Sequence, residues 1–455
     1  MNYKEFSCMS NWASLETLQR NFNPMKTITT IAYLLFLLAA TRTEAELTIP
    51  GADGSDGDLI ITTNTVIDLS QAVTANWDAD NTANPGGGVY DSNQWAVVFK
   101  YSSVNIAAGA TVTFKNHLSR APVVWLVSGN VTINGSVILD GQVGVLPPYL
   151  SEPGPGGFRG GAGWYSVGVA NAPGFGPGGG LVNIFNDNRY GGGGSYGSVG
   201  YYGPSVYGNP SLVPLIGGSG GSGCSASGLF GACGGAGGGA IAIFCSGILN
   251  NSGLISANGG NSLAPSGGQS GGGSGGGIRI VSQTLAGNGV IQALGGGLTS
   301  IGGYPGQIPF GGLGRIRLER VVNTNSISVT PDPSVVDLPP NSTALIWPPN
   351  NAPGINIVSI GTTNAPTDPR AGFGTIGADI VQPLTNSIPV VIETTNVEQA
   401  SQVLVRGTPR SNGTSTTVNA SVSSIVNTSP LTILWTANLP VNVGYSAVQV
   451  QVVRP

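Results

Sequence analysis

Titratable side chains are scarce in this chain of 455 residues. Only 8% of its residues are charged, against about a quarter in typical soluble domains. The formal net charge is −4, and lysine beyond the N-terminal segment is limited to Lys100 and Lys115. Nucleic acids and anionic membranes attract clusters of Lys and Arg, and the sequence has no such cluster. We therefore expect no nucleic-acid partner and no binding to an acidic lipid surface.

Cysteine is also rare. Three cysteines follow the N-terminal segment, and two of them, Cys224 and Cys233, flank the small-residue loop SASGLFGA. In an oxidising compartment a disulfide between these two would restrict an otherwise flexible loop, and we expect it to form. Cys245 lies in the strand-like run IAIFC, where it is expected to pack as a small apolar residue. Three cysteines without a convincing fourth ligand argue against a zinc site.

Long hydrophobic runs are absent except for Ile31–Ala40. This run follows a lysine and precedes two small residues separated by one position, an order typical of a secretory signal peptide over Met25–Ala45. It is too short for a membrane span, and the mature chain therefore has no expected span. The residues before Met25 are expected to be an upstream extension, with a long n-region of the signal peptide as the alternative. Residues 1–45 are therefore expected to be absent from a secreted mature chain that begins at Glu46.

A phrase of strands and glycines occurs three times. The copies are Ala121–Gly141, Ala240–Gly260 and Gly277–Gly296. Val124, Ile241 and Ile278 occupy matching positions when the copies are aligned. Each copy holds about three short β-prone runs, too few to bury an apolar face alone, so the copies must stack. The hydrophobic period is near two. We therefore expect an all-β, right-handed parallel β-helix (solenoid) with glycine-rich insertions over residues 46–330.

Residues 141–239 interrupt this rhythm with glycine runs such as GGGGSYGSVGYYGPSVYG. Glycine loses much backbone entropy on ordering, so a flexible low-complexity insert is one interpretation. The recurring aromatic residues favour another one, an excursion of the β-helix that is partly ordered by rings packed on glycine backbone. Flat rings on such a surface also suit the stacking of sugars. The candidate ligand-binding residues are Tyr196, Tyr201, Tyr202 and Tyr207, with packing against the solenoid wall as the alternative.

The composition changes again near Pro331. Residues 331–354 are rich in proline and predict a linker, beyond which the glycine clusters disappear. Residues 355–455 contain alternating runs such as IPVVIETTNV and SAVQVQVVR. Short strands at near-regular spacing predict an immunoglobulin-like β-sandwich, which has no cysteines and therefore no disulfide between its sheets.

Five phrases carry a family resemblance: GSDGDLIITTNTVIDLS, WAVVFKYSSVNI, APVVWLVSGNVTINGSVILDGQ, EPGPGGFRGG and GGGSGGGIRIVSQTL. They resemble a group of uncharacterised glycine-rich secreted bacterial proteins with a parallel β-helix repeat. The resemblance covers roughly Leu47–Glu319. It implies an exported β-helical protein, and it transfers no catalytic residues to this chain.

One acidic segment is a candidate metal site. Asp53, Asp56 and Asp58 lie in GADGSDGDL, where flexible glycines could let the carboxylates wrap a hard cation such as calcium. The segment lacks the distal glutamate of an EF-hand loop and does not match the GGxGxDxUx calcium repeat. A solvated turn is the alternative interpretation. Calcium is the one cofactor that the sequence suggests.

Catalytic chemistry finds little support. A Ser–His–Asp site would have to use His117, the only histidine, and its position between two β-prone runs favours a turn residue. Glycoside hydrolysis needs two nearby carboxylates, but Asp140 of the first repeat is matched by Asn258 in the second, and the third has Leu294 nearby. The glycine runs are not followed by the lysine of a phosphate loop.

These features together favour a secreted, non-catalytic structural or adhesion protein, either extracellular or at the cell surface. Its expected partner is an extracellular glycan or a cell-surface molecule. The alternative is a polysaccharide-binding protein or a carbohydrate-active enzyme built on a β-helix.

Overall fold

Strands dominate the computed structural model of this chain. It describes residues 46–164, 171–183, 187–226, 230–265, 268–297, 309–370, 377–383, 386–411 and 413–455. The predicted upstream extension and signal peptide, residues 1–45, lie outside the described residues. In the described part of the chain, no helix has the length and apolar character needed to cross a membrane.

Two sheets form the first half of the fold. Within the described residues, the larger has ten strands in the order β16-β14-β12-β10-β7-β5-β4-β3, with β1 and β8 paired beside this path. Their bounds are β1 (Gly57–Ile61), β3 (Val73–Thr74), β4 (Val89–Asp91), β5 (Ala96–Ile106), β7 (Val123–Val127), β8 (Val131–Ile133), β10 (Ala240–Asn251), β12 (Gly277–Gly287), β14 (Arg315–Asn325) and β16 (Ser334–Asp337). Most pairs are parallel, as β10 is with β12, but β4 runs antiparallel to β5. The sheet is therefore mixed.

The second sheet has six described strands, all in parallel pairs, in the order β15-β13-β11-β9-β6-β2. Their bounds are β2 (Thr65–Asp68), β6 (Thr111–Lys115), β9 (Ser136–Ile138), β11 (Leu254–Ser256), β13 (Val290–Gln292) and β15 (Ser328–Thr330). A short 3-10 helix, Leu69–Gln71, follows β2, and the carboxylate of Asp68 caps it by accepting from the amide of Ser70.

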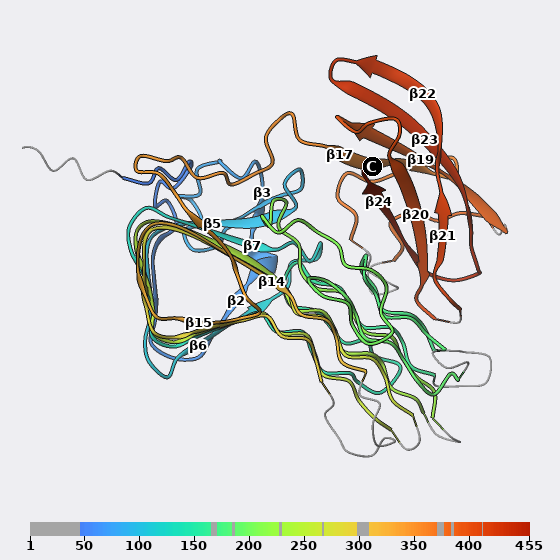
Figure 1. Ribbon diagram of the computed structural model, residues 1–455, viewed down its shortest axis with the longest axis horizontal. Helices are drawn as coiled ribbons and strands as arrows, with labels where there is room; N and C mark the ends of the chain where they lie inside the picture. Colours follow the sequence, from blue (N-terminus) through green and yellow to red (C-terminus); the bar gives the residue numbers. More distant parts are fainter. Residues whose placement is uncertain are drawn as a thin grey trace, which may run out of the picture. The chain divides into compact units, whose positions relative to one another are not determined.

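Each of the three sequence repeats supplies strands to both sheets, and the two stacks of strands face each other in Figure 1. A single apolar core fills the space between them. Its members include Val97, Trp125, Ile243, Ile280 and Leu318 from the larger sheet and Val112, Val137, Ile255 and Ile291 from the smaller one. The repeats therefore stack, because one copy alone leaves its apolar side chains without a partner layer.

The central strands of the larger sheet are buried on both faces. In β7 all five residues are buried: Trp125 points into the core between the sheets, whereas Leu126 joins a second core on the outer face, which includes Leu47 and Ile346. Such a strand shows no alternation from which its register could be derived. The predicted alignment of Val124 with Ile241 is accordingly wrong by one residue, since Ile241 pairs with Val123.

The glycine-rich segments form a region of their own, which we call the glycine layer. It comprises residues 153–163, 172–180, 191–200, 217–224, 231–239, 257–262, 268–277, 293–297 and 309–314. Figure 1 shows these extended segments, coloured from teal to orange, running side by side beyond the two sheets. Their described residues contain no strand beyond the first residue of β12, yet backbone hydrogen bonds join neighbouring segments throughout.

The direction of these hydrogen bonds repeats every three residues. Along 217–224, every third amide donates to the same neighbouring segment. The pairs are Gly218 with Gly238, Gly221 with Gly235, and Cys224 with Ala232. The intervening amides turn to other segments, as Ser222 does to the carbonyl of Gly192. A strand has a period of two, whereas an extended chain with three residues per turn is a polyproline II helix.

Only glycine fits the closest approaches in this layer. A Cβ atom on Gly220 would lie 2.0 Å from the carbonyl oxygen of Arg159, and one on Gly237 would lie 1.9 Å from that of Gly218. Real Cβ atoms essentially never approach another heavy atom within 3.0 Å. The clustering of glycine between residues 141 and 314 is therefore a packing requirement.

The predicted fold class is wrong. We expected a right-handed parallel β-helix with glycine-rich insertions, and the described residues instead form a mixed ten-stranded sheet, a parallel six-stranded sheet and a strandless glycine layer, without a closed solenoid. The physical reason is glycine itself: without side chains, segments at polyproline II spacing can bond to several neighbours, and a strand ladder does not form.

The C-terminal part of the chain forms two antiparallel sheets. Their described strands have the orders β18-β17-β19-β23-β22 and β21-β20-β24. The bounds are β17 (Gly354–Ile360), β18 (Thr363–Asn364), β19 (Ser387–Thr395), β20 (Gln402–Pro409), β21 (Thr416–Asn419), β22 (Ser421–Thr428), β23 (Leu431–Pro440) and β24 (Ser446–Val453). Ile392, Val405 and Trp435 belong to one shared core. Sheets of five and three strands differ from the four-plus-three arrangement of an immunoglobulin domain, so the predicted immunoglobulin-like sandwich is also wrong.

Candidate functional site

The three aspartates predicted to bind calcium have other partners. The carboxylate of Asp56 is buried and accepts from the amides of Lys100 (2.6 Å) and Gly86 (2.8 Å) and from the side chain of Asn81 (2.7 Å). Asp53 pairs with the fully buried ammonium group of Lys100 at 2.9 Å. Asp58 accepts from the hydroxyl of Ser103. Among the described residues no group of three or more acidic, His or Cys side chains is placed to hold a metal ion.

The acidic segment therefore has a structural role, because its three carboxylates attach it to Lys100 and Ser103 of β5. Burial alone would raise the pKa of Asp53, but hydrogen bonds from Ser55 and Lys100 outweigh burial and lower it. The carboxylate therefore stays ionised opposite the buried lysine. The predicted calcium site is not formed, because the lysine ammonium and backbone amides already satisfy the carboxylates.

The predicted disulfide between Cys224 and Cys233 is not formed either. Both thiols are free and buried. The sulfur of Cys233 donates to the carbonyl of Tyr149, and the sulfur of Cys224 accepts from the amide of Ala232. Burial raises the pKa of Cys224 to about 12 and that of Cys233 to about 11. Both remain protonated and unreactive, because the thiolate is the reactive form.

His117 is a buried structural residue. Its Nδ1 atom lies 2.8 Å from the hydroxyl of Ser119, and its ring packs on that of Tyr90 at 4.1 Å between centroids. Burial lowers the pKa of His117. Only 6% of the residue is exposed, so the contact with Ser119 closes a turn and leaves no open face for a substrate.

Asp140 also has a structural role. Its carboxylate accepts from the amide of Asn258 at 2.6 Å, and the side-chain oxygen of Asn258 accepts from the amide of Leu294 at 2.7 Å. Asp140, the matched Asn258 and the nearby Leu294 thus form a ladder across successive repeats. Polar side chains at these corners satisfy backbone amides of the next repeat.

The four candidate tyrosines separate into two pairs. Tyr196 and Tyr207 are buried, with ring centroids 4.7 Å apart, and their hydroxyls donate to the carbonyls of Ile216 (2.9 Å) and Gly217 (2.7 Å). With Leu212 they form a small core next to the glycine layer. The prediction that they bind a ligand is therefore wrong, because their rings and hydroxyls are fully used within the protein.

The other pair lies at the surface. Tyr202 is 52% exposed, Tyr201 is half-buried, and their rings meet edge to face with centroids 4.8 Å apart. The ring of Phe310, which is 51% exposed, lies 6.0 Å from that of Tyr201. We call the surface formed by Val199, Tyr201, Tyr202, Phe310 and Leu313 the aromatic patch.

Backbone hydrogen bonds hold the aromatic patch together. The amide of Tyr201 donates to the carbonyl of Phe310 at 2.9 Å, and the amide of Gly197 donates to that of Leu313 at 2.8 Å. Two segments more than a hundred residues apart thus run side by side. Phe310 and Leu313, both exposed, are three residues apart on an extended segment, the spacing that places side chains on one side of a polyproline II helix. Tyr201 and Tyr202 lie instead in a turn that the amide of Gly203 closes on the carbonyl of Gly200.

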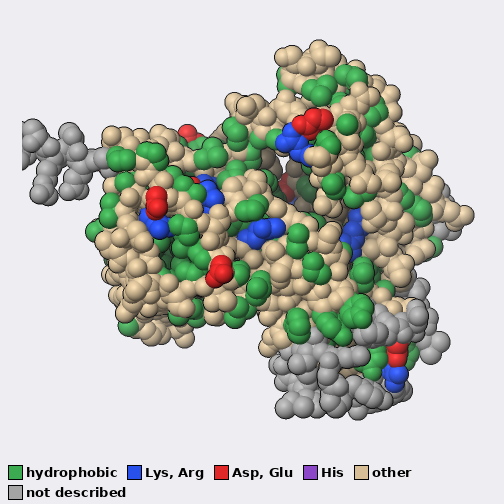
Figure 2. All heavy atoms as spheres, viewed as in Figure 1, with side chains coloured by type: hydrophobic (Ala, Val, Ile, Leu, Met, Phe, Trp, Pro, Cys, Tyr) green, Lys and Arg blue, Asp and Glu red, His purple; other side chains and the backbone are tan. Residues whose placement is uncertain are grey.

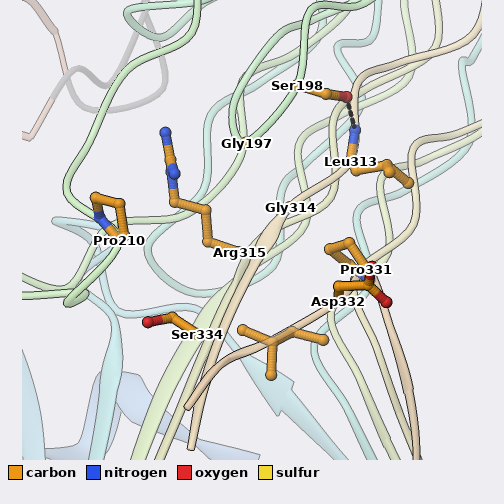
Figure 3. Close-up of a pocket in the computed structure, with 10 residues that line it drawn as sticks. Gly197, Ser198, Pro210, Leu313, Gly314, Arg315, Pro331, Asp332 and Ser334 are labelled. Atoms are coloured by element: carbon orange, nitrogen blue, oxygen red, sulfur yellow. Dashed lines mark hydrogen bonds between the residues drawn. The ribbon is translucent and has the colours of Figure 1, made fainter. Parts of the chain in front are cut away.

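A cavity of about 210 Å³ adjoins the patch at Leu313. Its lining includes Ser198, Pro210, Arg315, Pro331, Asp332 and Ser334. Figure 3 shows Arg315 and Pro210 on one side, with Pro331 and Asp332 on the other. The guanidinium of Arg315 is anchored by two hydrogen bonds to the carbonyl of Tyr207, at 3.2 and 2.9 Å, and lies over the ring of Tyr196.

Sequence reasoning missed Phe310, Arg315 and Asp332. Arg315 opens β14 and Asp332 lies in the proline-rich segment, and nothing in their spacing relates them. Arg315 and Asp332 line the same cavity because β14 pairs with β16, which begins two residues after Asp332. The available signal was Phe310, the one aromatic residue of PFGGLG, which lies in a glycine run like that of the tyrosines.

Charged side chains do not gather on the face of the molecule in Figure 2; they stand singly or in close pairs among hydrophobic and uncharged groups.

Comparisons of this chain with protein-family models, with curated proteins and with solved structures found no match.

Proposed function

We propose that this protein is a secreted, non-catalytic adhesion and scaffold protein of the extracellular space or cell surface. The carrying observation is the glycine layer, an ordered array of backbone that holds the aromatic patch on its surface. Ordering glycine segments costs much conformational entropy. A chain that nevertheless orders so many of them is consistent with a rigid scaffold that holds a binding surface, here the aromatic patch, in a fixed position.

The partners of three titratable groups, Asp53, Asp56 and His117, support a non-catalytic role. Asp53 and Asp56 are held by Lys100, by a serine or asparagine side chain, or by backbone amides, and His117 is enclosed by Tyr90 and Ser119. General acid–base catalysis needs such groups at an accessible site, within reach of a substrate.

Export is tested by fractionation of the producing cells and mass spectrometry of the purified chain. We expect the protein in the extracellular or cell-surface fraction, with Glu46 as its first residue. A cytosolic product that begins at Met1 would overturn the proposal. Retention on whole cells, measured with the fluorescently labelled mature chain, tests adhesion, and failure to bind any cell above a labelled-albumin control argues against it.

Polysaccharide binding is the second candidate function, and the aromatic patch favours it. Exposed rings next to a cavity that has a few polar groups are typical of small-ligand recognition, since rings give contact area and polar groups give orientation. Adhesion and polysaccharide binding are compatible, because a glycan can be the surface to which a scaffold attaches.

A further inference from the structure

We infer that the aromatic patch and the adjoining cavity form one binding site for a neutral, hexose-containing glycan chain. The inference rests on the proposed adhesion function and names the ligand class of its surface. One part of the site supplies flat hydrophobic contact, and the other supplies hydrogen-bonding groups.

The size of the cavity fits one sugar ring. Its volume of about 210 Å³ lies below the roughly 300–1,000 Å³ of pockets that enclose drug-sized molecules. A single residue of a glycan can enter it while the rest of the chain lies on the surface. Leu313 borders both regions, so the glycan would continue directly onto the patch.

The patch is a continuation of the cavity along one segment. Phe310 and Leu313 lie three residues apart on an extended chain that rises about 3.1 Å per residue, which separates them by roughly 9 Å. Tyr201 packs against Phe310, and Tyr202 extends the ring surface. Apolar faces of successive sugar rings can stack on such a row, as flat ligands do on aromatic side chains.

The polar groups of the cavity suit hydroxyl ligands. Asp332 is exposed and can accept from two hydroxyls, and the hydroxyl of Ser198, which accepts from the amide of Leu313 at 2.8 Å, retains its proton to donate. Arg315 uses Nε and Nη2 on the carbonyl of Tyr207, which leaves Nη1 to donate toward a ligand oxygen. The cavity thus offers both donors and acceptors.

The same groups select against acidic sugars. Side-on bidentate binding of a carboxylate uses Nε and Nη2 of an arginine, and both of these atoms of Arg315 already donate to the carbonyl of Tyr207. The carboxylate of Asp332, on the opposite side of the cavity, would repel a uronate. A neutral hexose meets neither obstacle.

The test is a glycan array probed with the full mature chain. The array carries neutral glucose, galactose and mannose oligosaccharides beside their uronic-acid counterparts. We expect binding to at least one neutral series and about three- to tenfold weaker binding in each of Tyr202→Ala and Phe310→Ala, because each removes one stacking ring. Asp332→Asn should weaken neutral binding as well, since it replaces a charged acceptor.

Tyr149→Ala is the matched control, because Tyr149 is 74% exposed on a different segment and belongs to neither the patch nor the cavity. Its binding should equal that of the wild type. Circular dichroism and unfolding midpoints of the variants establish that the fold is retained, and Tyr202→Phe, which keeps a ring, should restore binding.

Three results would overturn the inference. These are the absence of binding to every neutral series, preferential binding to uronic acids, and neutral binding that all three variants leave unchanged. Light scattering on the same samples addresses a second copy of this chain as the occupant: a dimer that Tyr202→Ala converts to a monomer would also overturn it. If export and cell retention persist without glycan binding, the proposed function stands and this inference alone fails.

Discussion

Two adjacent glycines provide a direct test of the packing of the glycine layer. A Cβ atom on Gly296 would lie 1.9 Å from the carbonyl oxygen of Gly260, whereas one on Gly297 would have its nearest neighbour at 3.9 Å, the side-chain oxygen of Asn261. Gly297 also lacks the positive φ that disfavours alanine. Gly296→Ala and Gly297→Ala therefore make the same chemical change in opposite packing environments.

The cost of Gly296→Ala follows from this geometry. To reach even the 3.0 Å limit, the segments must separate by about 1.1 Å, the difference between 3.0 and 1.9 Å. Overpacking of this kind costs about 1–3 kcal/mol. Separation also strains the bonds from Gly296 to Gly273 (2.8 Å) and from Gly311 to Gly296 (2.9 Å), and each backbone group left unpaired costs about 1–3 kcal/mol. We expect Gly296→Ala to lower the free energy of unfolding by about 3 kcal/mol or more.

Gly297→Ala should instead raise the free energy of unfolding by about 0.4–1 kcal/mol, because alanine restricts the unfolded chain and causes no strain in the folded one. Urea unfolding of the mature chain, followed by circular dichroism, measures both. The reasoning is refuted if the two variants unfold at the same urea concentration, or if Gly297→Ala is the less stable.

Three further predictions concern buried polar groups. Glu319→Gln should destabilise the fold by about 3 kcal/mol, because it leaves the buried guanidinium of Arg279, 2.9 Å away, without its counter-charge; a loss below about 1 kcal/mol in urea unfolding contradicts this. Tyr207→Phe should cost about 1–3 kcal/mol, because the hydroxyl bonds to Gly217 and Ser219, whereas Tyr149→Phe, at a side chain that is 74% exposed, should be neutral; equal unfolding midpoints would be inconsistent with a buried Tyr207. Burial lowers the pKa of His117 in the folded protein below its usual 6.5, so the unfolded chain binds the proton more readily. The contribution of neutral His117 to stability is therefore complete above pH 6.5 and should be lost as the pH falls toward the pKa of the folded state. His117→Asn should reduce that pH dependence, and an unchanged slope in urea titrations from pH 7 to pH 4 would show that His117 does not cause it.

The sequence carried enough information to identify strands and stacking repeats. Ile241 and Ile278 were aligned correctly and are paired in the larger sheet. The first copy was misaligned because Val123 and Val124 are both buried, on opposite faces, and hydrophobicity does not distinguish them. The predicted fold class is wrong for a different reason. Glycine runs in a sequence indicate insertions, and only their three-residue hydrogen-bond period in the structure shows that they form a packed layer.

The candidate site was predicted in part. The sequence predicts a cluster of ligand-binding tyrosines, and two of its members, Tyr201 and Tyr202, lie at the surface. Tyr196 and Tyr207 have the same local composition, and their burial depends on contacts with Leu212 and Arg315 that no local pattern reveals. The predicted calcium site in the aspartate segment is wrong because Lys100, the cation that pairs with Asp53, is 47 positions away in the sequence.

Amide hydrogen exchange of the mature chain, measured by mass spectrometry, tests the central claim that the glycine-rich segments form an ordered layer. Peptides that cover 217–224 and 232–239 should exchange as slowly as peptides from β10, because their amides are buried and bonded to neighbouring segments. Exchange of these peptides at the rate of an unstructured chain, while β10 remains protected, would contradict the account.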